Sequence, residues 1–366
     1  MQGNTKYMRL ITPVIVAAAI AAVVLINLRQ PEKTGGGIEL VEGAIRIEKD
    51  GVRLADIARA LNDPDVLSYD EAAHRARTVA HIVVMPGGSL TIGSDDQPEV
   101  LEFDTNVCDS ASLSVAHQGK LELINSEIRT VDQTIYGGTC TRGYTVYVDG
   151  TLNAKNSRIL YVSGNRSEFF RGSKASGVLD NVEIARTDGS ALRLVHVDGS
   201  RLTLKNSRFI TSNDYGLFVF GGTVNPLRVE DSVMVGTAAD IFISRGTAEL
   251  VLVDCRFSPS KVRFENASGT LHVKRRQRVV VLQAGKPAAG VNVVAENEYE
   301  RVTGTTDADG AVVLEVTQQA ITNTGSQTHP PHVYRAMRGG SASAETKPMA
   351  AGPPGEPMPD ITLVLD

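Results

Sequence analysis

A short unit recurs through the middle of this chain, and it constrains the possible folds more than any other feature. Most copies have apolar residues at alternate positions, then Asn or Asp, then a small residue. The Asn or Asp residues are 31, 25, 25, 25 and 23 positions apart. A period of this kind is typical of folds in which small units stack and bury their apolar faces against one another. The six copies contain Asn125, Asn156, Asn181, Asn206, Asp231 and Asp254.

The repeat predicts short strands that stack in parallel. Alternating apolar residues place one side chain inward and the next outward, and the Gly, Asn, Asp and Ser residues between them mark turns. A leucine-rich repeat has a similar period, but the chain lacks the signature and the helical segment of that repeat. We therefore predict an all-β fold in which residues 90–268 form a parallel β-helix with coils about 4.8 Å apart.

The Asn and Asp column itself predicts a structural turn. Stacked Asn amides hydrogen-bond along a β stack, so we expect these residues to be structural. Asp231 and Asp254 continue the column. Because buried neighbouring carboxylates would repel one another, we expect the turn at this end of the column to be partly exposed to water. Cys255 stands where most other coils have Ser. We expect it to be a buried structural thiol.

Three Cys residues permit one disulfide and one free thiol. Cys108 precedes Asn125 by almost the same interval as Cys140 precedes Asn156. The two therefore occupy nearly the same place on neighbouring coils, whose spacing falls within the ~4.4–6.8 Å Cα separation of disulfides. We predict a Cys108–Cys140 disulfide.

The N-terminal segment predicts a membrane anchor. Residues 10–28 are apolar at all but three positions, and a bilayer is spanned by about 20 such residues as a helix. Two basic residues precede the run, which favours a cytoplasmic tail at residues 1–9. A cleaved signal peptide is the alternative. Residues 29–38 are expected to form a linker. In either case the rest of the chain lies outside the cytoplasm, in the periplasm or at the cell surface.

Residues 39–89 are expected to contain an N-terminal cap and the first coil. Leu54, Ile57, Ala58 and Leu61 have helical spacing, which predicts a capping helix. The end of a β-helix needs such a cap, because unpaired strand edges recruit other strands. Ser68, with Glu three residues later, has the pattern of a capping box and predicts a second helix.

Residues 269–366 change to hairpin-like alternation and predict a β-sandwich with a flexible loop at 337–358. The segments Lys286-Pro-Ala-Ala-Gly-Val-Asn-Val and Thr306-Asp-Ala-Asp-Gly-Ala-Val-Val-Leu-Glu-Val carry a resemblance. Over about 50 residues this part resembles the carboxypeptidase regulatory-like (transthyretin-like) β-sandwich. The resemblance implies an accessory, non-catalytic module.

Polar residues gather on three neighbouring coils. Subtracting about 25 from a residue number gives its stacked neighbour, which places Arg171 beside His196, Glu168 beside Arg193, and Asp188 beside Asn213, with Asp214 and Tyr215 following. Arg binds sugar carboxylates, and His or Tyr can transfer a proton at a ring carbon. The candidate catalytic residues are His196, Tyr215 and Asp214, and the candidate substrate-binding residues are Arg171, Arg193, Glu168, Asp188 and Asn213. A carbohydrate-binding face without catalysis and an ordinary solvated surface are the alternatives.

Other chemistries find little support in the sequence. The chain has 37 Lys and Arg against 42 Asp and Glu, a net charge of −5, which argues against a nucleic-acid partner. There is no phosphate-binding loop and no Cys/His cluster. Asp307-Ala-Asp309-Gly310 resembles part of a calcium loop but lacks the later ligands. We predict no cofactor and no metal, and calcium has no support beyond that turn.

A second resemblance involves residues 52–92. Leu54-Ala-Asp-Ile-Ala-Arg-Ala-Leu-Asn-Asp-Pro-Asp-Val-Leu67, followed by Pro-Gly-Gly-Ser-Leu-Thr-Ile92, resembles the start of alginate (mannuronan) C5-epimerase-type periplasmic β-helix proteins. The resemblance implies a right-handed, pectate-lyase-like parallel β-helix outside the cytoplasm. That family inverts C5 of mannuronate by removing and returning a proton. Its catalytic Asp-Pro-His motif has no counterpart here, since Ser212-Asn-Asp214-Tyr215 lacks both Pro and His.

The sequence as a whole favours a membrane-anchored cell-envelope protein that presents a face to a polysaccharide or to an envelope protein. The alternative is a polyuronate epimerase or lyase that abstracts a C5 proton with His196 or Tyr215 while Arg171 and Arg193 bind carboxylates. The enzyme alternative requires Arg171, Arg193, His196 and Asp214 to face one groove.

Overall fold

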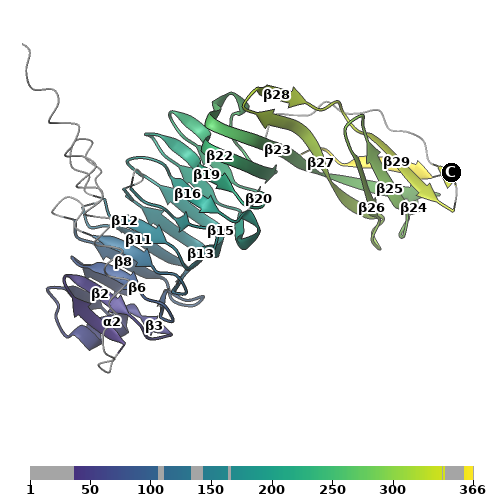
Figure 1. Cartoon of the computed structure of the whole chain (residues 1–366). Helices are drawn as coiled ribbons and strands as arrows, with labels where there is room; N and C mark the ends of the chain where they lie inside the picture. The colour runs from purple at the N-terminus through teal and green to yellow at the C-terminus, as the bar shows by residue number, and fades with distance from the viewer. Residues whose placement is uncertain are drawn as a thin grey trace, which may run out of the picture. The chain divides into compact units, whose positions relative to one another are not determined.

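The computed structural model describes residues 37–105, 111–132, 143–163, 166–339, 341–342 and 358–365 (Figure 1). From Gly37 onward the chain forms one compact unit. The predicted anchor at 10–28 and the predicted Cys108–Cys140 disulfide lie outside the described residues and stay predictions. Within the described ranges, no helix has the length and apolar character needed to cross a bilayer.

The N-terminal end of the fold is capped as predicted by one helix, α2, which begins at Leu54 and ends at Leu61. Asn62 ends it in a left-handed conformation. The second predicted helix is wrong: Leu67–Asp70 and Arg75–Thr78 are antiparallel strands instead. The carboxylate of Asp70 accepts the backbone N–H groups of Ala72 and Ala73, so it forms the turn that joins the two strands. The elements are β1 (Ile38–Val41), β2 (Ala44–Ile47), β3 (Val52–Arg53), α2 (Leu54–Leu61), β4 (Leu67–Asp70) and β5 (Arg75–Thr78).

The central region is a stack of coils, and it confirms the all-β prediction with large parallel sheets. Thr151 pairs with Ser176, and Gly177 with Leu202, each one period of the repeat further along the chain, as predicted. Inward side chains such as Leu152, Leu179 and Leu204 are buried in one continuous core. The elements of this coil stack are β6 (His81–Val84), β7 (Ser89–Ile92), β8 (Glu99–Phe103), β9 (Ser112–Val115), β10 (Lys120–Ile124), β11 (Ser126–Thr130), β12 (Thr145–Val148), β13 (Thr151–Leu160), β14 (Phe170–Arg171), β15 (Ser176–Ala185), β16 (Leu192–Val197), η1 (Gly199–Arg201), β17 (Leu202–Lys205), β18 (Arg208–Ile210), β19 (Tyr215–Thr223), β20 (Leu227–Glu230), β21 (Val233–Val235), β22 (Ala239–Val253), η2 (Pro259–Lys261) and the first part of β23 (Val262–Gln283).

The repeated Asn and Asp residues are turn residues, as predicted, and the structure adds the reason. All six have a left-handed backbone, with φ between 47° and 55°, a conformation in which Asn and Asp are favoured over other non-glycine residues. Their side chains form a ladder only in part. Asn181 donates to Asn156 at 2.8 Å, whereas Asn206 donates to Asp180 and Asn125 to the backbone of Ser94. Backbone geometry therefore explains the repeat.

The position after the column is buried and satisfies backbone groups. The N–H of Ser126 donates to the hydroxyl of Ser157, and that of Ser207 to the hydroxyl of Ser232. Cys255 continues this position with a free thiol that is 2% exposed. Its thiol donates to the carbonyl of Val229, and burial raises its pKa to about 12. The prediction of a buried structural thiol is confirmed.

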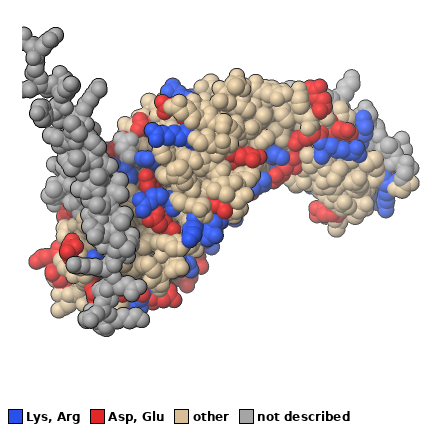
Figure 2. All heavy atoms as spheres, viewed as in Figure 1, with Lys and Arg blue, Asp and Glu red and all other residues tan. Residues whose placement is uncertain are grey.

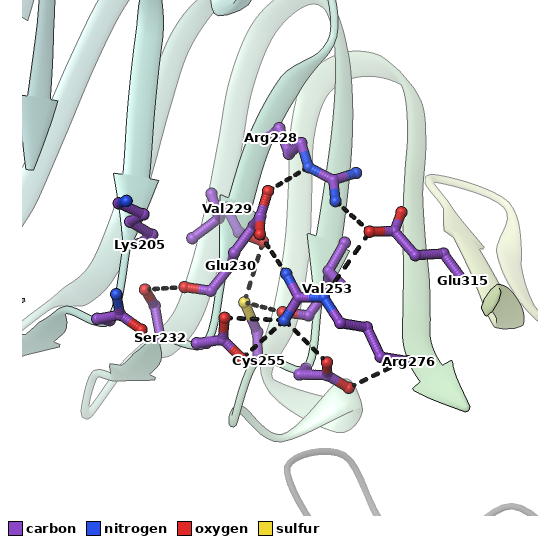
Figure 3. Close-up of polar contacts among 12 residues, drawn as sticks. Lys205, Arg228, Val229, Glu230, Ser232, Val253, Cys255, Arg276 and Glu315 are labelled. Carbon is purple, nitrogen blue, oxygen red and sulfur yellow. Dashed lines mark hydrogen bonds and ion pairs between the residues drawn. The ribbon is translucent and has the colours of Figure 1, made fainter. Parts of the chain in front are cut away.

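The column ends in a cluster of charges (Figure 3). Arg276 on β23 donates to both Asp231 and Asp254, at 2.8 and 3.1 Å, and it also contacts Glu230. The guanidinium therefore neutralises the two neighbouring carboxylates whose repulsion the sequence indicated. Glu315, on a strand beyond the coil stack, joins the cluster at 3.8 Å from Arg276.

The strand β23 continues past the coil stack into a second core. It pairs with β27 antiparallel and with β31 in parallel, while β25, β26, β29 and β30 form a separate sheet. Both sheets contribute to one cluster of buried residues, including Val281, Val293, Leu314, Tyr334 and Leu363. The elements are β24 (Lys286–Pro287), β25 (Asn292–Glu296), β26 (Arg301–Thr305), β27 (Ala311–Thr322), β28 (Gly325–Thr328), β29 (Val333–Arg338), β30 (Ser341–Ala342) and β31 (Ile361–Leu365).

Candidate functional site

Four aromatic side chains gather on one outward-facing side of the coil stack, where three are half-buried and Phe242 is 8% exposed. We call Tyr215, Phe218, Phe220 and Phe242 the aromatic patch. Tyr215 stacks on Phe242 with ring centroids 4.3 Å apart, and Phe218 lies 5.0 Å from Phe242. Phe220 meets Phe218 edge-on at 6.1 Å. These distances fall in the ~4.5–7 Å range of favourable aromatic pairs or just below it, so the rings form one connected surface.

Strand register places Phe218, Phe220 and Phe242 at outward positions, and Tyr215, which pairs with Ala239, joins them through its ring contacts. On β19, Phe218 and Phe220 alternate with Leu217 and Val219, which are fully buried. Phe218 pairs with Phe242 of β22 on the next coil. The strands β16, β19 and β22 lie side by side in the stack (Figure 1). The outward positions of three coils therefore meet on one face.

Two arginines border the aromatic patch. The Arg193 guanidinium lies 5.2 Å from the ring of Phe218 and 5.8 Å from that of Phe220. The Arg245 guanidinium lies 5.3 Å from Phe220, and Arg245 is exposed. Cation–π contacts of this length hold a guanidinium in place. The face thus combines apolar ring surface with positioned cations.

His196 stands beside Phe220 in an uncommon backbone conformation. Its φ is 52°, and that of Arg245 is 60°, whereas the corresponding corner of the intervening coil has glycine, at Gly221. The imidazole lies over Gly221, with Nδ1 3.1 Å from the carbonyl oxygen, and meets Phe220 edge-on at 5.9 Å. A bulky residue in the left-handed region costs about 1–2 kcal/mol, and such strain is concentrated at functional sites.

The predicted binding arginines are partly engaged by carboxylates of the chain itself. Arg171 donates two 2.6 Å hydrogen bonds to Asp149, and Glu168 lies 3.8 Å from Arg171 and 3.7 Å from Arg193. The predicted neighbourhood of Glu168 and Arg193 is therefore present. Hydrogen bonding to Asp149 raises the pKa of Arg171, which keeps this ion pair charged.

The predicted pairing of Arg171 with His196 is wrong by one position, because Arg171 pairs with Val195. Asp188 and Asn213 lie at a coil corner instead of on the aromatic face. Asn213 donates to the carbonyl of Thr187 at 2.9 Å, and the hydroxyl of Ser163 donates to Asp188 at 3.4 Å. These contacts give both residues a structural role.

The candidate proton-transfer residues are not brought together. Leu217 pairs with Leu192, so Tyr215 is level with Ser190, six positions before His196. Between the two rings lie those of Phe218 and Phe220, with ring-to-ring steps of 5.4, 6.1 and 5.9 Å from Tyr215 to His196. A single sugar ring cannot contact both, so the pair cannot deliver protons to opposite faces of one carbon.

Tyr215 is also poorly suited to act as a base. Burial, followed by the negative charge of Asp214, raises the pKa of its hydroxyl. A base has to lose its proton near the working pH, and a raised pKa moves the tyrosine further from that condition. The hydroxyl stays protonated and able to donate a hydrogen bond.

Charged residues on another outward face balance one another. Arg129 contacts Glu102 and Glu127, each at 2.7 Å, and Arg158 contacts Glu127 at 2.8 Å and Glu183 at 3.0 Å. Blue and red side chains alternate over the visible coils in Figure 2. The contacts of Arg129 and Arg158 form a ladder of ion pairs along the stack.

No candidate metal centre occurs among the described residues. The carboxylate of Asp307 accepts the N–H groups of Asp309 and Ala311, at 2.9 and 3.0 Å, which explains that segment as a turn. His332 is 5% exposed and donates to Glu300 at 2.9 Å. It is part of the second core.

No protein-family model and no curated protein matches the chain. It is similar in structure to a double mutant of the periplasmic alginate epimerase AlgG, with 11% identity, 66% of this chain and 72% of that chain covered, and a TM-score of 0.37. A structure of the periplasmic alginate epimerase AlgG has 12% identity and a TM-score of 0.26, with 62% of this chain and 85% of that chain covered. ORF18 of Geobacillus virus E2 has 9% identity and a TM-score of 0.16, with 87% of this chain and 82% of that chain covered. Such TM-scores carry no argument about activity.

Proposed function

We propose that the chain is a polysaccharide-binding protein of the cell envelope, with the aromatic patch as its binding face. The proposal includes a right-handed parallel β-helix followed by a β-sandwich, anchored by residues 10–28 with the folded part outside the cytoplasm. The observation that carries the function is the aromatic patch on β19 and β22, bordered by Arg193 and His196 on β16 and by Arg245 on β22.

The chemistry of this face matches that of a sugar chain. A pyranose ring has an apolar C–H face, which gains free energy when it covers aromatic surface and loses contact with water. Its ring substituents need hydrogen-bond partners, and the Tyr215 hydroxyl and the His196 imidazole can supply them. Arg193 and Arg245 add donors for a carboxylate, so a uronate-containing polysaccharide is the class we propose. Binding without catalysis fits the separation of Tyr215 from His196 by the Phe218 and Phe220 rings better than C5 proton transfer does.

His196→Gly separates binding from folding. Glycine accepts a φ of 52° without strain, so we expect the free energy of unfolding of the variant to stay level or to rise by about 1 kcal/mol. Its affinity for polyuronate oligosaccharides should fall, because a donor beside Phe220 is lost. Isothermal titration calorimetry on the full chain, with thermal unfolding alongside it, measures both quantities.

Phe218→Ala tests the aromatic surface directly. We expect the dissociation constant to rise about tenfold, since stacking of a nucleic-acid base on one aromatic ring contributes ~1–3 kcal/mol and the apolar face of a sugar covers a similar ring area. Val178→Ala, at an exposed position on a different strand, is the matched control and should bind normally. Unchanged affinity in both His196→Gly and Phe218→Ala would place the binding face elsewhere.

A further inference from the structure

The two ends of the coil stack are covered unequally. At the N-terminal end, β1 pairs with β2, and α2 contributes Ala58 and Leu61 to the core boundary. At the other end the last coil is β23. Its residues 270–280 are covered by β27, whereas residues 262–267 pair with β22 on one edge and, within the described chain, with no strand on the other. Val262 and Phe264 are only partly buried there.

This open edge has the composition of a strand that pairs with another strand. Val262 and Phe264 pair with buried residues of β22 and point toward the core, while Arg263 and Glu265 between them are exposed. Neither Arg263 nor Glu265 forms a hydrogen bond or an ion pair with another described residue. An exposed edge with apolar inward residues recruits a further strand.

We infer that this edge, residues 262–266, joins a second copy of the same chain in antiparallel register. A two-fold axis at Phe264 sets Arg263 of each copy opposite Glu265 of the other, and Phe264 opposite Phe264. Both charge pairs are then attractive, and directly opposed side chains on antiparallel strands interact strongly enough to select partners. The interface is isologous, as in most homodimers.

Charge reversal tests the register. We expect sedimentation velocity of the full chain over a wide concentration range to show a monomer–dimer equilibrium. Arg263→Glu opposes two pairs of like charges and should raise the dimer dissociation constant about tenfold or more, and Glu265→Arg should do the same. An equimolar mixture of the two variants should dimerise again, because every Glu then faces an Arg. Lys286→Glu, at an exposed position of β24, is the control for net charge.

The two substituted positions are exposed, so thermal unfolding of the variants should match that of the unmodified chain. A chain that stays monomeric at all concentrations would overturn the inference. Dimers that both single variants leave unchanged would also overturn it, as would a mixture that fails to recover. Polysaccharide binding is measured separately on the same samples, because Arg263 pairs with Phe242 of the aromatic patch.

Discussion

Arg276→Met is expected to lower the free energy of unfolding by about 2 kcal/mol, between the values typical of exposed and of buried ion pairs. Arg276 is the shared cation of Glu230, Asp231 and Asp254 (Figure 3), and its removal leaves carboxylates of adjacent coils facing one another. Exposed ion pairs contribute about 0–1 kcal/mol each, and breaking a buried pair costs about 3–5 kcal/mol. The Arg276 side chain is 29% exposed, so the expected loss lies between these limits.

A background in which the column carries no charge should reduce that loss. Asn occupies the equivalent positions in earlier coils with the same left-handed backbone, so Asp231→Asn and Asp254→Asn preserve the turns. In the double-Asn background, Arg276→Met should cost less than about 1 kcal/mol. Urea unfolding followed by circular dichroism gives all four free energies. Equal losses in both backgrounds would show that Arg276 does not act by neutralising Asp231 and Asp254.

Glu300→Gln is expected to cost about 2 kcal/mol at neutral pH, because the carboxylate has a lowered pKa and its charge is partly screened by solvent. Burial alone would raise the pKa of Glu300, but hydrogen bonds from His332 and from the N–H and hydroxyl of Thr317, with the charge of Lys274, lower it to about 2. Against an ordinary value of 4.5, the full difference would correspond to about 3 kcal/mol at ~1.4 kcal/mol per pKa unit, and solvent screening of this half-buried group reduces it. The variant loses the charge that those donors stabilise.

The same pKa fixes the direction of the pH dependence. Because the pKa is lower in the folded chain than in the unfolded one, the contribution is fully present above about pH 4.5 and is lost as the pH falls toward about 2. Glu300→Gln should remove this part of the acid sensitivity, and the exposed neighbour Glu298→Gln should not. Urea midpoints measured at neutral pH and near pH 3 provide the comparison. Parallel pH profiles for Glu300→Gln and the unmodified chain would contradict the assignment.

Most of the fold could be predicted from the sequence because one local signal repeats. The left-handed turn selects Asn or Asp in each coil, so the spacing from Asn156 to Asp254 reports the coil length directly. The second capping helix was wrong because the pattern at Ser68 is local, whereas Arg75–Thr78 gains a long-range partner in β8. Pairing with a distant strand outweighs a capping motif when it covers a sheet edge.

The site was less predictable, for reasons of register and backbone. Corner lengths vary between coils, so Arg171 pairs with Val195, and a fixed repeat interval misplaces it by one position. The aromatic patch is absent from the sequence predictions. Its outward positions could have been found, because Arg193 pairs with Phe218 and Phe218 pairs with Phe242 on successive coils. The left-handed backbone of His196 has no local signal, since its neighbour Gly221 is compatible with many conformations.

The measurement that most directly tests the account is proton NMR of the full chain with polyuronate oligosaccharides in heavy water, with and without calcium. The account predicts saturation transfer from protein to the sugar-ring protons, lost in Phe218→Ala, with the H5 signal unchanged over time. Loss of the H5 signal or new unsaturated ends would establish C5 chemistry and contradict binding without catalysis. Absence of any saturation transfer would contradict the polysaccharide-binding face itself.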